Sequence, residues 1–424
     1  MRAPDFTRYA LSLSVAAAIL PGCGGSQQPI GSPGALSQAA AHVPNVTSLG
    51  MRHDEQRAIQ HVIVIVQESR SFDNLFAGYP NADAPTKGLT STGKYVPLKP
   101  ISLANGSCDA TYLMGRFDVV YDDGKMDGWN LLDAKEPLCP YTRVERSETL
   151  RYWDLAKRFA LADRMFGSTI YGDFVEQLYL IAGTTKISSR VFVVGPPSQV
   201  PWGCDAPPGT TTRVLRRGHV QLGGPFPCFT QFPTMANLLD KANVSWKCYY
   251  GKDNRWVLNP FQAIQYVVSG PDRTRNMSRP ATNVLTDLRS GHLPAVSWVI
   301  SPPADSDFPG YERGPKWVNS IVLATEESRY WAHAAVVVIW DDSGEGRFYD
   351  NAAPPQITEV GLGVRVPMIV VSPYAKRGYV SHTTYQFGSI LKFIEENWHL
   401  GSLGSTDKRS QSIGDIFDFN AAAE

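Results

Sequence analysis

The stretch that decides the fold is His61-Val62-Ile63-Val64-Ile65-Val66-Gln67, which is followed directly by Glu68. The run has the length of one strand, is rich in β-branched residues and does not alternate with polar residues. A continuous apolar run of this kind is typical of a strand covered on both faces, as in a parallel sheet. The sequence therefore predicts a central strand with a carboxylate at its carboxyl end.

Other segments of the chain repeat this apolar character, and helical patterns lie between them. The further strand-like runs are Ala295–Ile300, Ala335–Trp340 and Val366–Val371. The helical patterns cover residues 148–160, 233–243, 315–332 and 387–398. Because strands and helices alternate, the predicted fold class is α/β, a three-layer α/β/α sandwich with a mainly parallel central sheet. Ligands bind outside the carboxyl ends of strands in such sheets, so the residues after each strand are site candidates.

The N-terminal residues have the pattern of an export signal. Arg2 and Arg8 precede the apolar residues 9–20, a stretch too short for a stable spanning helix, so residues 1–22 are predicted to be a signal peptide. The sequence Leu20-Pro21-Gly22-Cys23 resembles a bacterial lipobox, in which Cys23 is lipidated and becomes the mature N-terminus. Signal-peptide cleavage without lipidation stays open as the alternative.

The rest of the chain divides into a tether and one large domain. Residues 23–57 are rich in Gly, Ser, Gln, Ala and Pro, which predicts a flexible tether. The domain is expected over residues 58–418, with a cysteine-containing insertion near 190–230. The protein is therefore expected to be exported, either anchored to a membrane through a lipid on Cys23 or secreted or periplasmic. Forty basic residues balance forty acidic ones, so the net charge gives no electrostatic case for nucleic-acid binding.

The cysteines after the lipobox indicate disulfides, which export permits. Cys204 and Cys228 flank a Pro/Gly-rich loop and form the natural pair, and Cys108 with Cys139 is the second. The remaining thiol, Cys248, is expected to be free. No cysteine or histidine spacing supports a zinc site.

The first candidate site follows the strand at 61–67. Burying Glu68 at a strand end is unfavourable unless a divalent cation, an arginine or a helix N-terminus lies close to it. Arg70 suits either a pair with Glu68 or a phosphate group. The structural alternative is a Glu–Arg pair with an N-cap at Ser69 or Ser71.

The second candidate site is Asp341–Asp342, which follows the apolar run ending at Trp340. Adjacent carboxylates repel each other, and two at a strand end are unfavourable without a cation. Oxygen ligands of this kind favour a hard divalent metal ion such as Mg²⁺, Ca²⁺ or Mn²⁺. The alternative is a turn or cap role.

The third candidate is Asp173, which follows Gly172 and precedes an apolar helical pattern. A helix N-terminus favours anions because its backbone N–H groups and its dipole point at them. Asp173 is either part of such a site or simply the cap of the helix.

Several ordered motifs together resemble the bacterial phosphoesterase family that contains the phospholipases C and related acid phosphatases, in the alkaline-phosphatase-like superfamily. The resemblance covers roughly residues 58–418. The motifs are Gln67-Glu68-Ser69-Arg70-Ser71-Phe72-Asp73, Gly124-Lys125-Met126-Asp127-Gly128, Val296–Ile300, Trp340-Asp341-Asp342 with Phe348-Tyr349-Asp350, and Arg365-Val366-Pro367 through Ser372-Pro373-Tyr374.

The resemblance implies metal-dependent phosphoryl transfer on a phosphate ester or phospholipid substrate. Glu68 and Ser69 fall on the family's first metal-site motif and Asp341 and Asp342 on its second. Asp173 falls on the position of the nucleophile, and Arg70 is assigned to phosphate binding.

The chain also departs from the family pattern at positions that matter for catalysis. The family usually has Asn at Ser69 and Ser or Thr at Asp173, and it often has His at Asp118, Phe308 and Asn351. A carboxylate nucleophile is chemically possible, but it adds negative charge beside a dianionic substrate. Two hypotheses therefore stay open, an active phosphoesterase and a degenerate, tethered binding protein on the same fold.

Overall fold

The computed structural model describes residues 58–106, 108, 116–251, 259–344, 346–355 and 360–420. The predicted signal peptide, Cys23 and the tether lie outside the described residues, so export and lipidation stay predictions. No helix in the described part of the chain is long and apolar enough to cross a membrane.

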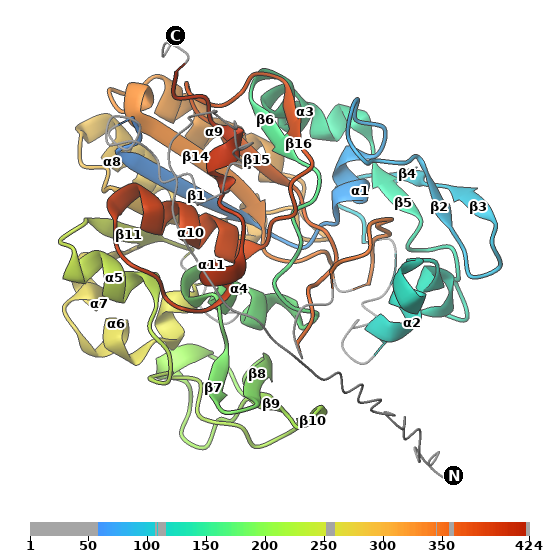
Figure 1. The fold of residues 1–424 in the computed structure, drawn as a ribbon, viewed down its shortest axis with the longest axis horizontal. Coiled ribbons are helices and arrows are strands. Elements are labelled where there is room, and N and C mark those ends of the chain that lie inside the picture. Colours follow the sequence, from blue (N-terminus) through green and yellow to red (C-terminus); the bar gives the residue numbers. More distant parts are fainter. Residues whose placement is uncertain are drawn as a thin grey trace, which may run out of the picture. The chain divides into compact units, whose positions relative to one another are not determined.

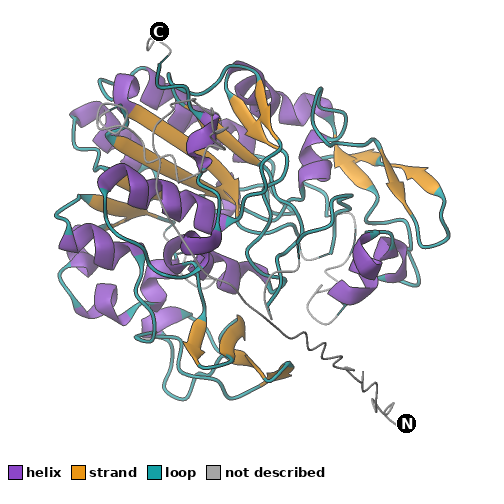
Figure 2. Ribbon diagram, viewed as in Figure 1, coloured by secondary structure: helices purple, strands orange, loops and turns teal. Residues whose placement is uncertain are grey.

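An eight-stranded sheet forms the centre of the described domain (Figures 1 and 2). In spatial order its strands are β12 (Met277–Ser278), β11 (Trp246–Tyr249), β13 (Val296–Ile300), β1 (His61–Gln67), β14 (Ala334–Trp340), β15 (Met368–Val371), β6 (Ala160–Ala162) and β16 (Tyr379–Ser381). β15 runs antiparallel to both of its neighbours, and the other paired strands run parallel. The predicted α/β fold with a mainly parallel sheet is confirmed.

The two central strands are buried along almost their whole length. Every residue of β14 is buried, as is all of β1 after His61. Both strands are rich in branched apolar residues, which pack well where helices cover both faces of a sheet. The strands pair in register from His61 with Ala334 to Gln67 with Trp340, so their carboxyl ends are level.

Helices flank the sheet in two groups. One group contains α3 (Arg146–Arg158), α8 (Asn283–Ser290) and α9 (Gly314–Glu326), with α9 packed on both of the others. The other contains α4 (Gly172–Ala182), α5 (Met235–Lys241), α10 (Phe387–Trp398) and α11 (Thr406–Arg409), and α4 and α10 lie on the near side of the sheet in Figure 1. The four predicted helices correspond to α3, α5, α9 and α10. Shorter helices are α1 (Phe72–Phe76), α2 (Phe117–Tyr121), α6 (Gln265–Ser269) and α7 (Asp272–Arg275).

Three small sheets lie outside the central one. The largest has the order β10 (His219–Gln221), β9 (Arg213–Arg216), β8 (Val191–Gly195) and β7 (Lys186–Ser188), and it overlaps the stretch predicted to be an insertion. The other two pair β2 (Lys87–Leu89) with β3 (Tyr95–Pro97) and β4 (Lys99–Ile101) with β5 (Thr142–Val144).

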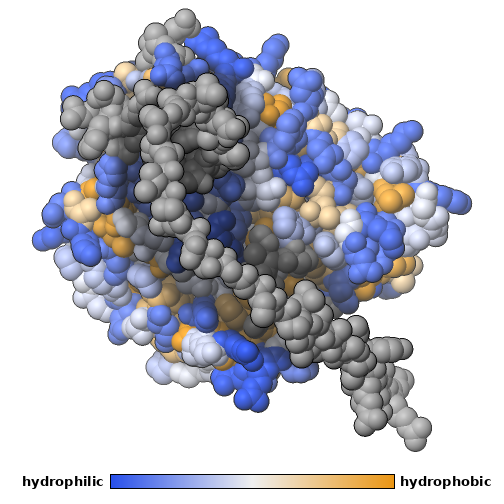
Figure 3. All heavy atoms as spheres, viewed as in Figure 1, coloured by the Kyte–Doolittle hydropathy of each residue, from blue (hydrophilic) through white to orange (hydrophobic). Residues whose placement is uncertain are grey.

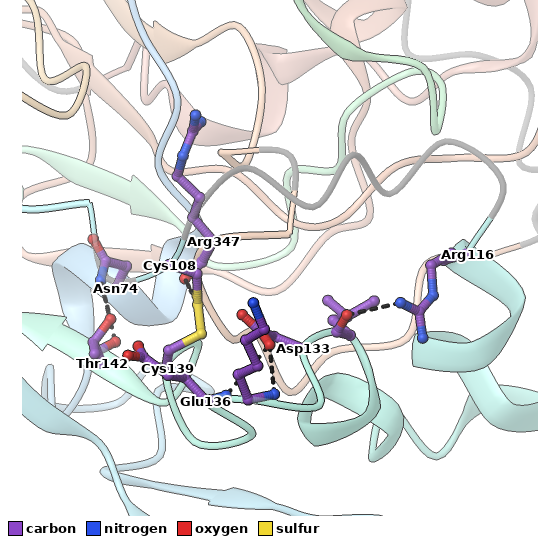
Figure 4. The surroundings of a disulfide bond; sticks show 10 residues. Asn74, Cys108, Arg116, Asp133, Glu136, Cys139, Thr142 and Arg347 are labelled. Atoms are coloured by element: carbon purple, nitrogen blue, oxygen red, sulfur yellow. Dashed lines mark hydrogen bonds between the residues drawn. A yellow bond between two sulfur atoms is a disulfide. The ribbon is translucent and has the colours of Figure 1, made fainter.

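The predicted disulfides are confirmed. Cys204 is bonded to Cys228 and Cys108 to Cys139, the latter shown with its surroundings in Figure 4. Cys248 is a free, buried thiol, and burial raises its pKa. The bond between Cys108 and Cys139 holds together two loops that lie 31 residues apart in the sequence.

A fully buried arginine, Arg365, ties several loops together at the carboxyl edge of the sheet. Its guanidinium donates to carboxylates that are themselves buried, with Nε 3.0 Å from Asp350 Oδ1 and one terminal nitrogen 3.0 Å from Asp73 Oδ1. The remaining acceptors are Asn351 Oδ1 at 2.8 Å and the carbonyl oxygens of Asp83 at 2.8 Å and Asp163 at 2.7 Å. The buried acidic pair therefore has a matching cation.

Arg365→Lys is expected to lower the free energy of unfolding by about 3 kcal/mol or more, because lysine cannot reproduce these donors and leaves two carboxylates buried without full compensation. Urea denaturation measures the change. The matched control is Arg273→Ala, since Arg273 and Asp205 form an exposed ion pair whose loss is expected to change stability by less than about 1 kcal/mol. Equal effects of the two substitutions would contradict the role of Arg365.

Glu395 on α10 predicts a pH dependence of stability. Burial raises its pKa to about 8, partly offset by the hydrogen bond that its Oε1 accepts from Leu403 N at 2.9 Å. A carboxyl whose folded pKa is raised stabilises the fold below its unfolded pKa of about 4.5, and this contribution is lost as the pH rises through about 8. Glu395→Gln is therefore expected to be more stable than the parent at about pH 9, by about 1–2 kcal/mol after solvent screening, and not at about pH 5.

Urea titrations of both proteins at the two pH values measure this difference. An equal offset between parent and Glu395→Gln at both pH values would mean that ionisation of Glu395 does not contribute.

Candidate active site

The register of β1 and β14 places the first two candidate motifs together. Because Gln67 is level with Trp340, Glu68 and Asp341 leave the sheet as neighbours. Backbone and side-chain hydrogen bonds join the two strand ends, from Asp341 N to Gln67 O at 2.9 Å and from Ser69 N to Asp341 Oδ1 at 3.3 Å. The residues predicted from each strand end therefore share one edge of the sheet.

Ser69 holds this junction in an unusual backbone conformation. Its φ of 58° lies in the left-handed region, where residues with a Cβ are uncommon and often functional. Its hydroxyl donates to Asp342 Oδ2 at 3.4 Å, and Arg70 N donates to Asp342 O at 3.0 Å. Gly344 closes the turn with a φ of 87°, where a Cβ would lie 3.0 Å from the carbonyl oxygen of Ser69.

Helix α4 brings Asp173 to the same edge of the sheet. The helix begins at Gly172, and Asp173 is its second residue, as the sequence predicts. Asp173 is partly exposed, whereas Glu68 is 8% and Asp341 1% exposed. Four residues further along the helix, Gln177 Nε2 donates to Asp341 Oδ2 at 3.1 Å and fixes α4 to the end of β14.

Glu68, Asp173, Asp341 and Asp342 form what we call the carboxylate cluster. Burial raises the pKa of Glu68 well above its ordinary value, and the charges of Asp173 and Asp342 raise it further. Burial and the other three members likewise raise the pKa of Asp341. Burial and Asp173 raise the pKa of Asp342, against smaller lowerings by the hydrogen bond from Gly344 N and by the charge of Arg347. The cluster thus concentrates negative charge that the surrounding protein only partly compensates.

The cluster has the donor chemistry of a hard divalent cation. Glu68 Oε1 is buried and has no hydrogen-bond partner among the described residues, which is unfavourable for a carboxylate. A bound cation would supply the missing partner and reverse the rise in the pKa values. Within the described ranges, however, no group of three or more His, Cys, Asp or Glu side chains is arranged to hold a metal ion. Coordination would therefore require side chains of the cluster to rotate toward one another.

Arg70 is engaged inside the protein. Its fully buried guanidinium donates to Asp307 O at 2.8 Å, to Asn74 Oδ1 at 3.1 Å and to Leu103 O. A phosphate contact by Arg70 would require one of these acceptors to be given up. The alternative N-cap at Ser71 is confirmed, since its hydroxyl accepts from Asn74 N at 3.2 Å and caps α1.

Sequence reasoning missed Arg347, the cation whose charge lowers the pKa of Asp342. Its guanidinium lies 5.7 Å from the ring centre of the partly exposed Phe308. The backbone oxygen of Arg347 lies 3.8 Å from Cys108 Sγ, and Figure 4 shows its side chain extending away from the disulfide. The useful signal was its place in the loop that follows Asp342.

The positions at which the resemblance expects histidines have different surroundings. Asn351 lies with Arg365, to which its Oδ1 is bonded, and its Nδ2 donates to Asp83 Oδ1 at 2.8 Å. Phe308 lies beside Arg347, and Asp118 lies in α2. Two further polar residues that were not predicted border the site, Gln177 and the buried Glu176. Gln177 lies four residues and Glu176 three residues after Asp173 on one helix, and this spacing is a signal that was available.

The chain is similar to curated bacterial phospholipases. It is 24% identical to a non-hemolytic phospholipase C of Pseudomonas aeruginosa over 89% of this chain and 59% of that protein. It is 23% identical to phospholipase C A of Mycobacterium tuberculosis over 84% of this chain and 76% of that protein. The chain thus spans less than two thirds of the Pseudomonas relative's length.

Similarity to solved structures is weaker. A protein in the alkaline phosphatase superfamily from Vibrio parahaemolyticus aligns with a TM-score of 0.39 and 9% identity, over 84% of this chain and 72% of that one. The phosphoesterase family model, in contrast, matches residues 59–401, which include the whole carboxylate cluster. The chain therefore belongs to the phosphoesterase family.

Proposed function

We propose that this protein is a divalent-metal-dependent hydrolase of phosphate esters that acts on phospholipid head groups or related diesters. The observation that supports this most is the carboxylate cluster at the ends of β1 and β14, in which Glu68 Oε1 is buried without a partner. The relatives named phospholipase C support the substrate class.

Each residue of the site has a proposed role. Glu68, Asp341 and Asp342 would hold the cation, Mg²⁺, Ca²⁺ or Mn²⁺, and Ser69 would contribute a hydroxyl oxygen or orient Asp342. When bound, the metal neutralises charge on the phosphate. Arg347 holds the phosphate from the side of Phe308, because arginine pairs well with phosphate oxygens and its position beside the ring limits its motion.

Asp173 is proposed as the nucleophile. One of its oxygens bonds to phosphorus, and the bond from phosphorus to the leaving oxygen breaks, with its electron pair going to that oxygen, which takes a proton from water. A second water then attacks the phosphorus of the aspartyl phosphate, and its proton passes to the hydroxide left by the first water. The bond from phosphorus to the Asp173 oxygen breaks with its electron pair going to that oxygen, which releases the Asp173 carboxylate and the phosphorylated product. The partial exposure of Asp173 gives both reactants access to it.

The alternative is a degenerate relative that binds but does not hydrolyse. The observations that favour it are the carboxylate at position 173 and the phenyl ring of Phe308, which can neither donate a proton nor contact phosphate as histidine does.

Purified protein is expected to hydrolyse a chromogenic phosphodiester only with a divalent ion, and Asp342→Asn to lower kcat/KM by about 100-fold or more. Independently of turnover, added metal is expected to raise the Tm of the parent and not that of Asp342→Asn, because binding to the folded state stabilises it. Asp205→Asn, an exposed carboxylate, serves as the control and should behave like the parent. Rates that are equal in parent and Asp342→Asn would refute the metal-dependent mechanism.

Asp173 distinguishes the two hypotheses. Asp173→Asn is expected to reduce hydrolysis by about 100-fold or more while the metal-induced rise in Tm persists, since the other three carboxylates remain. The degenerate alternative instead requires an inert parent that gains activity in Asp173→Ser/Phe308→His. Asn351 is left unchanged in that variant because its amide is bonded to Arg365 and Asp83.

A further inference from the structure

The small sheet β7–β10 and its loops form a positively charged region in a chain whose formal net charge is zero. Between Glu176 and Asp240 the sequence has one acidic residue, Asp205, which pairs with Arg273 at 3.1 Å. The basic residues of the same stretch, all exposed, are Lys186, Arg190, Arg213, Arg216 and Arg217. Charge of one sign on a neutral protein indicates an anionic partner.

The register of the strands places some of these basic residues at one end of the small sheet. Val191 at the start of β8 pairs with Arg216 at the end of β9, so the β7–β8 and β9–β10 turns lie at the same end. Arg190 occupies the first turn, and Arg216 and Arg217 lie at the second. Arg217 and Gly218 both have positive φ, which forms a tight turn and holds the arginine at the tip.

Apolar side chains are exposed on the same small sheet. β10 is the edge strand of the sheet, and Val220 and Leu222 lie two residues apart on it and just beyond its end, with 47% and 79% of their surface exposed. Phe226 follows on the adjoining loop with 37% exposed. In Figure 3 hydrophilic and hydrophobic atoms adjoin at the lower edge of the view, where Figure 1 labels this sheet. Exposed apolar residues on an edge strand are unfavourable unless something covers them.

We propose that this sheet docks on an anionic phospholipid surface. The arginines at the turns contact lipid phosphates, and Val220 and Leu222 enter the boundary between head groups and acyl chains. The docking extends the proposed hydrolase function to the lipid surface, and it requires neither a lipid on Cys23 nor catalysis.

Vesicle binding tests this docking with full-length Cys23→Ser protein in the presence of a metal chelator, so that neither a lipid anchor nor turnover contributes. The protein is expected to co-sediment with phosphatidylcholine–phosphatidylglycerol vesicles and much less with phosphatidylcholine alone. Arg216→Glu/Arg217→Glu is expected to weaken that binding about tenfold or more, since each basic residue adds to the attraction. Leu222→Trp is expected to shift its emission to the blue when the mixed vesicles are added.

The matched controls are on α3, where Arg151 is exposed and Leu150 is 48% exposed. Arg151→Glu should bind like the parent, and Leu150→Trp should show no emission shift on vesicles. Binding that is unaffected by the charge reversal, or a Leu222→Trp emission that does not move, would overturn the proposal. Dimerisation that is lost in the Leu222 variant, without vesicle binding in the parent, would assign the surface to a second copy instead. Loss of hydrolysis on soluble diesters does not bear on these binding results, so the two proposals fail separately.

Discussion

This structure depends on how it accommodates carboxylates that are buried at the ends of parallel strands. Each such carboxylate must either lie next to a positive charge or become protonated and neutral. The carboxyl edge of the sheet meets this constraint in two ways. Around Arg365, Asp73 and Asp350 have a guanidinium bonded to each of them. In the carboxylate cluster burial raises the pKa of Glu68 and Asp341, and no arginine or lysine is bonded to either of them in the described residues. The first arrangement is what a structural acidic pair requires, whereas the second leaves buried carboxyl groups with raised pKa values.

The two arrangements also depend on each other. Asp73 on α1 and Asp350 in the loop after β14 are bonded to Arg365, while Glu68 and Asp341–Asp342 precede them on the same two segments. The ionic group around Arg365 therefore holds the segments that present the cluster. The ionic group around Arg365 stabilises the edge of the sheet, so the carboxylate cluster can be electrostatically unfavourable without destabilising that edge. This is expected when well-packed neighbours compensate for strain at a functional site.

Sequence reasoning predicted the parts of the fold that are local. The apolar runs of β1, β13, β14 and β15 and the patterns of α3, α5, α9 and α10 are visible in short windows of sequence. The antiparallel direction of β15 was not, because a strand buried on both faces has the same composition in either direction. The partners of Arg70 were also hidden, since Asp307 lies 237 residues away and Leu103 33 residues away. The spacing from Asp173 to Gln177 and the place of Arg347 in the loop after Asp342 were visible and unused, whereas the contact between Arg347 and Phe308 was not visible.

The contact between Arg347 and Phe308 bears on one of the replacements that suggest a degenerate site, the phenylalanine at a position where the family often has histidine. Histidine at position 308 would offer a proton and, when protonated, a charge. Phenylalanine offers neither, but its ring face attracts the guanidinium that lies 5.7 Å away. In the proposed site Arg347, on a neighbouring loop, thus supplies the positive charge that a protonated histidine would supply. Arg347 cannot donate a proton to the leaving group, because arginine stays protonated. A site of this kind retains phosphate binding and relies on water to protonate the leaving group, so substrates with good leaving groups should be turned over in preference to those with poor ones.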